Sequence, residues 1–194
     1  MSNPTSPANE TDQPPPADTE PTNPFRYIVS PGFADLLEQL ESTLLLTTYQ
    51  AGKLMAVRAQ AGWVSTLLRT FERPMGLARK DDKLALGTRN AVWFLRDARD
   101  IAPQLAPASP YDACFTPRQS HVTGDILGHE MSWGHPPPAI GGEAAQGSPT
   151  NELWLVNTRF SCLCTLHPDY SFVPRWRPSF VSALAAEDRC HLNG

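Results

Sequence analysis

Residues 44–57, LLLTTYQAGKLMAV, form the stretch that decides the fold class of this chain. Short apolar and β-branched runs flank Gln50-Ala51-Gly52, a pattern that predicts two strands joined by a turn. Residues 84–95, LALGTRNAVWFL, have the same form around Arg89-Asn90. The two segments therefore predict two β-hairpins.

The two hairpins also match each other at a spacing of about forty residues, which indicates an internal repeat. The identical pairs are Leu44 and Leu84, Leu46 and Leu86, Thr48 and Thr88, and Ala51 and Ala91. A third copy lies at residues 152–159, ELWLVNTR, which resemble residues 83–89 after a slip of one residue. A β-bulge would explain that slip, and a false match is the alternative.

Repeated hairpins at this period are typical of the blades of a β-propeller. We expect a mostly β fold, a partial propeller of about three blades with one short N-terminal helix and long Pro/Gly-rich loops. An ordinary β-sandwich with coincidental Leu-x-Leu strands is the alternative. Propellers typically close with about four to eight blades, so the sequence further predicts that this chain is the N-terminal part of a longer propeller.

Pro and Gly mark the predicted helix start and the predicted loops of the other segments. Ser30-Pro31 predicts the start of the short helix, because Ser can cap it and Pro suits its first position. Its predicted apolar stripe consists of Phe33, Leu36, Leu37 and Leu40. Residues 101–120 and 134–150, rich in Pro and Gly, are expected to be loop insertions.

Charge and composition divide the chain in two. Residues 1–24 are acidic and Pro-rich and predict a disordered tail, while residues 25–194 are expected to form the incomplete propeller domain. The tail holds four carboxylates and no Lys or Arg. These four negative charges equal the excess of the 20 Asp and Glu over the 16 Lys and Arg of the whole chain. The remaining domain is thus nearly neutral.

A neutral domain restricts the partners that we expect. It offers no basic cluster for nucleic acid or for a polybasic membrane anchor, so neither partner is predicted. Residues 1–24 contain no apolar run of a secretion signal, which favours a cytoplasmic location. The four cysteines, Cys114, Cys162, Cys164 and Cys190, are then expected to be free thiols.

Several strings of residues resemble the signature of an uncharacterised protein family. They are Thr123-Gly124-Asp125, His129-Glu130, and residues 157–163, 172–178 and 187–194. Members of that family are similar to six-bladed β-propellers and are longer than this chain. The resemblance covers roughly residues 26–194 and implies the propeller fold and a truncated chain, but it implies no chemistry.

Polar residues inside these apolar strings are the candidates for a binding site. They are His129, Glu130, Asn157, Arg159, Arg189, His191 and Asn193. In a propeller such residues can line the mouth of the central channel. The alternative is structural, with Arg159 and Arg189 paired to acidic neighbours that lock one blade to the next.

No metal site is assigned from the sequence, because neither His-Glu-x-x-His nor Cys-x-x-Cys occurs. A group of His121, Asp125, His129 and Glu130 could hold a metal, but backbone hydrogen bonding at loop ends explains these residues as well. Cys162 and Cys164 are expected on one face of a strand, where core packing is favoured over metal binding.

Two hypotheses for function follow. The first is a non-catalytic module that binds an unknown small molecule or protein, because no catalytic motif is present. The second is a metal-assisted hydrolase or lactonase of the six-bladed propeller type, with Glu130, Asn157, His191 and Asn193 in its site. The first requires no cofactor, whereas the second requires a divalent cation.

Overall fold

A computed structural model of the chain describes residues 27–105, 111–134, 152–187 and 189–193. The predicted tail and most of the predicted loop 134–150 lie outside these residues. The described elements are one α-helix, one short 3-10 helix and eleven strands. They are α1 (Phe33–Gln39), β1 (Leu44–Thr48), β2 (Lys53–Gln60), β3 (Trp63–Thr70), β4 (Leu77–Lys80), β5 (Lys83–Gly87), β6 (Ala91–Asp97), η1 (Ala102–Gln104), β7 (Phe115–Val122), β8 (Gly128–Gly134), β9 (Glu152–Asn157), β10 (Cys162–His167) and β11 (Tyr170–Trp176).

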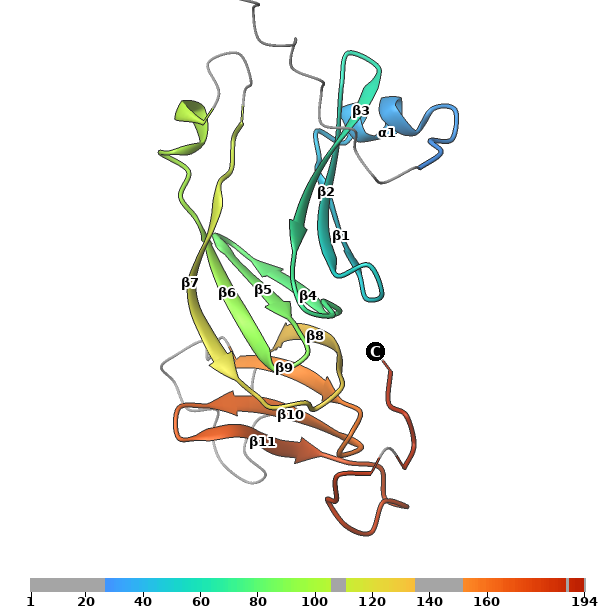
Figure 1. Cartoon of the computed structure of the whole chain (residues 1–194), viewed down its shortest axis with the longest axis vertical. Helices are drawn as coiled ribbons and strands as arrows, with labels where there is room; N and C mark the ends of the chain where they lie inside the picture. The colour runs from blue at the N-terminus through green and yellow to red at the C-terminus, as the bar shows by residue number, and fades with distance from the viewer. Residues whose placement is uncertain (1–26, 106–110, 135–151, 188, 194) are drawn as a thin grey trace, which may run out of the picture.

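The described strands form three antiparallel sheets that follow one another along the chain (Figure 1). Sheet 1 has the order β1-β2-β3, sheet 2 the order β4-β5-β6-β7, and sheet 3 the order β11-β10-β9-β8. The first strands of sheets 2 and 3, β4 and β8, pack against each other. The fold is therefore mostly β, and three successive sheets of this kind are consistent with part of a β-propeller.

The same crossing of the chain recurs in each sheet. In sheet 1, the segment after β3 crosses the β1–β2 turn, where Phe71 N donates to the Gly52 carbonyl at 3.0 Å. In sheet 2, the segment after β7 crosses the β5–β6 turn, where Thr123 N donates to the Asn90 carbonyl at 2.9 Å. In sheet 3, Arg189 N donates to Ser161 Oγ at 3.1 Å. Each crossing also includes one non-glycine residue with positive φ: Arg73 at 46°, Leu127 at 49° and His191 at 40°.

Two apolar clusters hold the sheets together. Leu84, Leu86 and Leu95 of sheet 2 face Leu54 of sheet 1, with Leu45, Phe71 and Leu77 packed beside them. The other face of sheet 2, with Ala85 and Val92, packs against sheet 3 at Leu153, Leu155, Cys162 and Cys164. Sheet 2 is covered on both faces, and the three central residues of its second strand, Leu84 to Leu86, are all apolar and buried. Burial of each such leucine contributes about 1.5–3 kcal/mol.

The first two predicted hairpins and their turns are confirmed. No bulge in β9 accounts for the one-residue slip of the third match, because β9 pairs regularly with β10 from Trp154 to Asn157. The irregularity between Gly128 and Met131 in the β8–β9 pairing places its extra residue on β8. β4 begins at Leu77, and Met75 belongs to the crossing segment before it, where the Met75 carbonyl accepts from Thr47 Oγ1.

Two predictions about the less regular segments are wrong. Residues 101–120 are not one loop, because β7 begins at Phe115 and includes Pro117. Pro117 is accommodated at a register shift on the outermost strand of sheet 2, where its missing N–H leaves no ladder partner unpaired. The helix begins at Phe33 rather than Pro31, because Gly32 occupies the N-cap with φ 80° and no side chain caps it.

Candidate functional site

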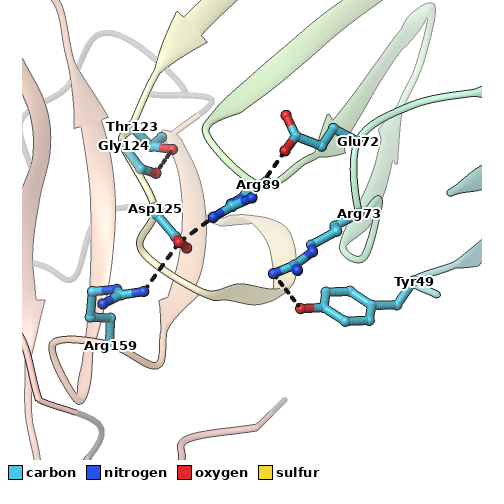
Figure 2. A network of polar contacts seen from close by, with 8 residues as sticks. All are labelled: Tyr49, Glu72, Arg73, Arg89, Thr123, Gly124, Asp125 and Arg159. Carbon is cyan, nitrogen blue, oxygen red and sulfur yellow. Dashed lines mark hydrogen bonds and ion pairs between the residues drawn. The ribbon is translucent and has the colours of Figure 1, made fainter.

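Asp125 lies at the centre of an ion-paired network that joins the sheets (Figure 2). Its Oδ2 atom is 3.5 Å from Arg89 Nε in the β5–β6 turn of sheet 2 and 3.2 Å from Arg159 Nη2 in the β9–β10 turn of sheet 3. Arg89 Nη1 is also 3.3 Å from Glu72 Oε1 in the segment that leaves sheet 1. The network therefore links the two sheet-to-sheet crossings, which carry Glu72 and Asp125, with the hairpin turns of sheets 2 and 3, which carry Arg89 and Arg159.

The backbone positions both arginines in the same way. Arg89 N donates to the Glu72 carbonyl at 3.0 Å, and Arg159 N donates to the Ile126 carbonyl at 3.1 Å. Glu72 and Ile126 each immediately precede the positive-φ residue of their crossing segment. The Thr-Arg turns of two repeats thus dock onto equivalent backbone positions and direct two guanidinium groups toward one carboxylate.

The charges in this network balance. Asp125 is shared by two guanidinium groups, and Glu72 is the second carboxylate, paired with Arg89. Side-chain exposures of 29% for Asp125, 39% for Arg89 and 35% for Arg159 leave the group partly in solvent. The buried Asp125 Oδ1 and Arg159 Nε atoms have no hydrogen-bond partner among the described residues.

An open pocket of about 360 Å³ lies directly beside Asp125 and Arg159. Thr123 to Ile126 form one wall, the Arg159-Phe160 turn forms another, and Ser171 and Phe172 of β11 complete it. The Phe160 and Phe172 rings are 5.0 Å apart, so they supply one continuous apolar wall. The pocket therefore combines a cation, a clamping carboxylate and an aromatic surface, which is the usual composition of a small-molecule site.

Of the residues predicted for binding, His129 and Glu130 lie at a second, much smaller cavity. His129 and Glu130 of β8 line it together with Thr88 and Thr123, and its volume of about 10 Å³ fits about one water molecule. The His129 and His191 rings meet edge to face, with centroids 5.1 Å apart. The structure thus brings together two histidines that are distant in the sequence.

The other predicted residues are placed differently. Asn157 is fully buried, and its Oδ1 accepts from Phe160 N at 3.1 Å, so it shapes the turn that carries Arg159. Arg189 forms a local ion pair with Glu187 at 2.9 Å and joins no other sheet through its side chain. Asn193 is exposed. The predicted inter-blade lock is therefore present for Arg159 but not for Arg189.

Sequence reasoning missed Arg89 and Glu72 as members of the site. The signal that could have revealed Arg89 is the Thr-Arg pair, which occurs at residues 88–89 and again at residues 158–159 in matching repeat positions. Glu72 and Phe172 carry no such pattern, because they approach the site from separate segments.

Cys162 and Cys164 belong to the core, as predicted. Both are fully buried and face sheet 2 from β10. A hydrogen bond with Cys162, together with burial, raises the pKa of Cys164 well above the ordinary thiol range. Cys164 is therefore held as a neutral thiol and is unsuited to act as a nucleophile. Among the described residues, no group of three or more His, Cys, Asp or Glu is arranged to hold a metal ion.

Comparison with known proteins gives the family and nothing more specific. Residues 31–194 match a family model described as Domain of unknown function (DUF4915). The chain therefore belongs to this family of uncharacterised domains. No curated protein and no solved structure matches it. In the part of the chain that the structure describes, no helix has the length and apolar character needed to span a bilayer.

Proposed function

We propose that this protein is a non-catalytic binding module whose ligand is a small molecule with a carboxylate and a flat apolar part. The observation that carries the proposal is the pocket beside Asp125 and Arg159. Arg159 offers a guanidinium group that is 35% exposed, and a guanidinium matches a carboxylate through paired N–H donors. Phe160 and Phe172 offer the surface on which a ring packs.

The role of Asp125 in this proposal is to orient the guanidinium groups. Asp125 pairs with Arg159 through Nη2 alone, so a ligand carboxylate would bind to the other N–H donors of the Arg159 guanidinium group. No residue in the pocket is a nucleophile activated by a base within hydrogen-bond reach, which favours binding over covalent catalysis. The sequence leaves a protein open as the ligand as well, without specifying its chemistry.

The first prediction uses benzoate as the probe, because it carries one carboxylate on one ring. Titration of the full-length chain, followed by ligand-observed NMR, is expected to give a dissociation constant on the order of a millimolar. Benzamide, which has the same shape without the charge, is expected to bind more weakly. Arg159→Gln removes the guanidinium and is expected to weaken benzoate binding by about tenfold, equivalent to about 1.4 kcal/mol.

The matched control is Arg69→Gln, because Arg69 is an exposed arginine on β3 of sheet 1, far from the pocket. This variant should bind benzoate as the unmodified chain does. Equal loss of binding in both variants, equal affinity for benzoate and benzamide, or no binding of either compound would contradict the proposed ligand class.

The hydrolase or lactonase remains the second candidate, and the approach of the His129 and His191 rings is the observation in its favour. Two imidazoles can begin a metal site, to which Glu130 or Asn193 would have to add oxygen ligands. Elemental analysis of the purified full-length chain separates the two candidates. Stoichiometric metal that is lost on His129→Ala would favour the enzyme and count against the metal-free module.

A further inference from the structure

We propose that His121 of β7 is a positioning residue for one wall of the pocket beside Asp125. That wall consists of Ser171 and Phe172 of β11 and is called the Ser171-Phe172 wall below. The His121 Nε2 atom lies 2.9 Å from the Ser171 carbonyl oxygen. The inference rests on the proposed function, because it concerns how the same pocket holds the apolar part of its ligand.

The hydrogen bond from His121 joins two sheets. A carbonyl oxygen can only accept, so the imidazole carries a proton on Nε2 and donates it. His121 stands opposite Val92 in the β6–β7 ladder, and Val92 belongs to the core between sheets 2 and 3. Residues directly opposite in a ladder share a face, so His121 faces sheet 3. It therefore bridges the outermost strands of the two sheets, β7 and β11, whose places can be followed in Figure 1.

The pairing of β11 with β10 is irregular at this same wall. The register shifts between Thr165 and His167 of β10, so Ser171 and Phe172 together lie opposite a single residue of β10. A bulge of this kind disrupts the ladder locally and reorients the side chains beside it. Among the described residues, β11 also has no strand on its other side. The ladder alone thus holds the Ser171-Phe172 wall less firmly than a regular strand would be held.

The other two walls of the pocket are joined to each other through the backbone. Arg159 N donates to the Ile126 carbonyl at 3.1 Å, which links the β9–β10 turn to the crossing segment. The Ser171-Phe172 wall contacts the Phe160 ring of that turn, but an apolar contact has no preferred direction. The hydrogen bond from His121 does have one. We infer that His121 sets the position of this wall relative to the Arg159 guanidinium group.

A fixed wall matters most for a rigid ligand. In benzoate, the distance between the carboxylate and the ring cannot change. Both of its contacts form together only where the Ser171-Phe172 wall stands at the matching distance from Arg159. Without the hydrogen bond from His121, binding has to order the wall as well, which lowers the affinity.

The second prediction compares two substitutions of His121 in the full-length chain. His121→Met removes the donor and is expected to weaken benzoate binding about fivefold, because one neutral hydrogen bond is lost. His121→Gln retains a side-chain N–H and is expected to bind benzoate within about twofold of the unmodified chain. The matched control is Gln119→Met, because Gln119 is exposed on the same face of β7, two residues earlier. It should leave the affinity unchanged.

A measurement without ligand separates failure of this inference from failure of the proposed function. Backbone amides of residues 170–173 should exchange about fivefold faster in His121→Met than in the unmodified chain, measured by mass spectrometry of peptic fragments. His121→Gln should restore the slower rate. Equal exchange in all three forms, or no recovery in His121→Gln, would overturn the positioning role whether or not benzoate binds.

The two measurements together leave a decision in every case. Faster exchange in His121→Met with unchanged benzoate affinity would also overturn the inference, because the wall would then not matter to the ligand. If the unmodified chain fails to bind benzoate but shows the expected exchange, the proposed ligand class is wrong, and the role of His121 in holding the Ser171-Phe172 wall is supported.

Discussion

At the scale of single residues, Asp125 is the side chain that joins the arginines of sheets 2 and 3. It forms an ion pair with an arginine of each sheet, and its side chain is less exposed than that of either arginine. Ion pairs of this partly exposed kind contribute modestly to stability, but their loss leaves like charges facing each other. The expected role of Asp125 is therefore mostly to position Arg89 and Arg159.

The third prediction follows from that role. Asp125→Asn should lower the free energy of unfolding by about 1 kcal/mol, measured by urea denaturation, because two guanidinium groups lose their shared carboxylate. Asp82→Asn is the control, since Asp82 forms one exposed pair with Arg96, both side chains being about half exposed, at 49% and 48%. Its effect should be clearly smaller. Equal effects in the two variants would show that the Asp125 network contributes no more to the free energy of unfolding than a single exposed ion pair does.

Residue-level prediction from the sequence was partial, for a physical reason. Arg159, His129 and His191 stood out in the sequence because polar residues are unusual inside apolar strings, and their role in binding stays a prediction. The buried packing of Cys162 and Cys164 followed from strand alternation. Asn157 has the same sequence signal but is buried under the Arg159 turn. A polar residue in an apolar string can serve a ligand or the backbone, and only its surroundings distinguish the two.

At the scale of elements, the contact between β4 and β8 depends on a glycine. A Cβ atom on Gly76, just before β4, would clash with the His129 carbonyl oxygen and lie 2.8 Å from Met131 Cγ. Because the carbonyl belongs to the backbone of β8, it cannot move without shifting the strand. Gly76 therefore allows the first strands of sheets 2 and 3 to approach each other closely.

The fourth prediction tests this close approach. Gly76→Ala should destabilise the chain by about 1–3 kcal/mol in thermal or urea unfolding, because the added methyl group overpacks the β4–β8 contact. Gly128→Ala at the start of β8 is the control, since its nearest neighbour would be Ile126 Cγ1 at an ordinary 3.7 Å. If Gly76→Ala unfolds like the control, the two strands do not constrain each other as described.

The elements themselves were predictable to different degrees. The hairpins β1–β2 and β5–β6 were recognised because apolar runs and turn residues are local signals. β7 was missed because Pro117 and its polar neighbours are typical of a loop. An outer strand has only one paired edge and few buried residues, so pairing with β6 rather than local preference makes it a strand.

At the scale of the whole molecule, the three sheets differ in how well they are covered. Sheet 2 is packed on both faces, whereas the face of sheet 1 that carries Leu44 and Leu46 is partly open. The first strand of sheet 1 also lacks a pairing partner on one side among the described residues. Local opening should therefore begin in sheet 1.

The fifth prediction is a gradient of amide hydrogen exchange. Amides of β1 should exchange at least about a hundredfold faster than those of β9 and β10, measured by mass spectrometry of peptic fragments. The reason is that opening of β1 exposes less buried surface than opening of β9 or β10 does. Uniform exchange across the sheets would show that the chain opens as a single unit.

The sequence by itself determined that this protein is built from short strands joined by hairpin turns, because strand alternation and turn residues are local signals. Only the tertiary structure decided which residues meet. Asp125 joins Arg89 to Arg159, and Phe172 joins Phe160, through crossings between sheets that no local pattern encodes. The physical reason is that the shape of a site depends on how whole sheets pack, while the identity of each strand depends on its own few residues.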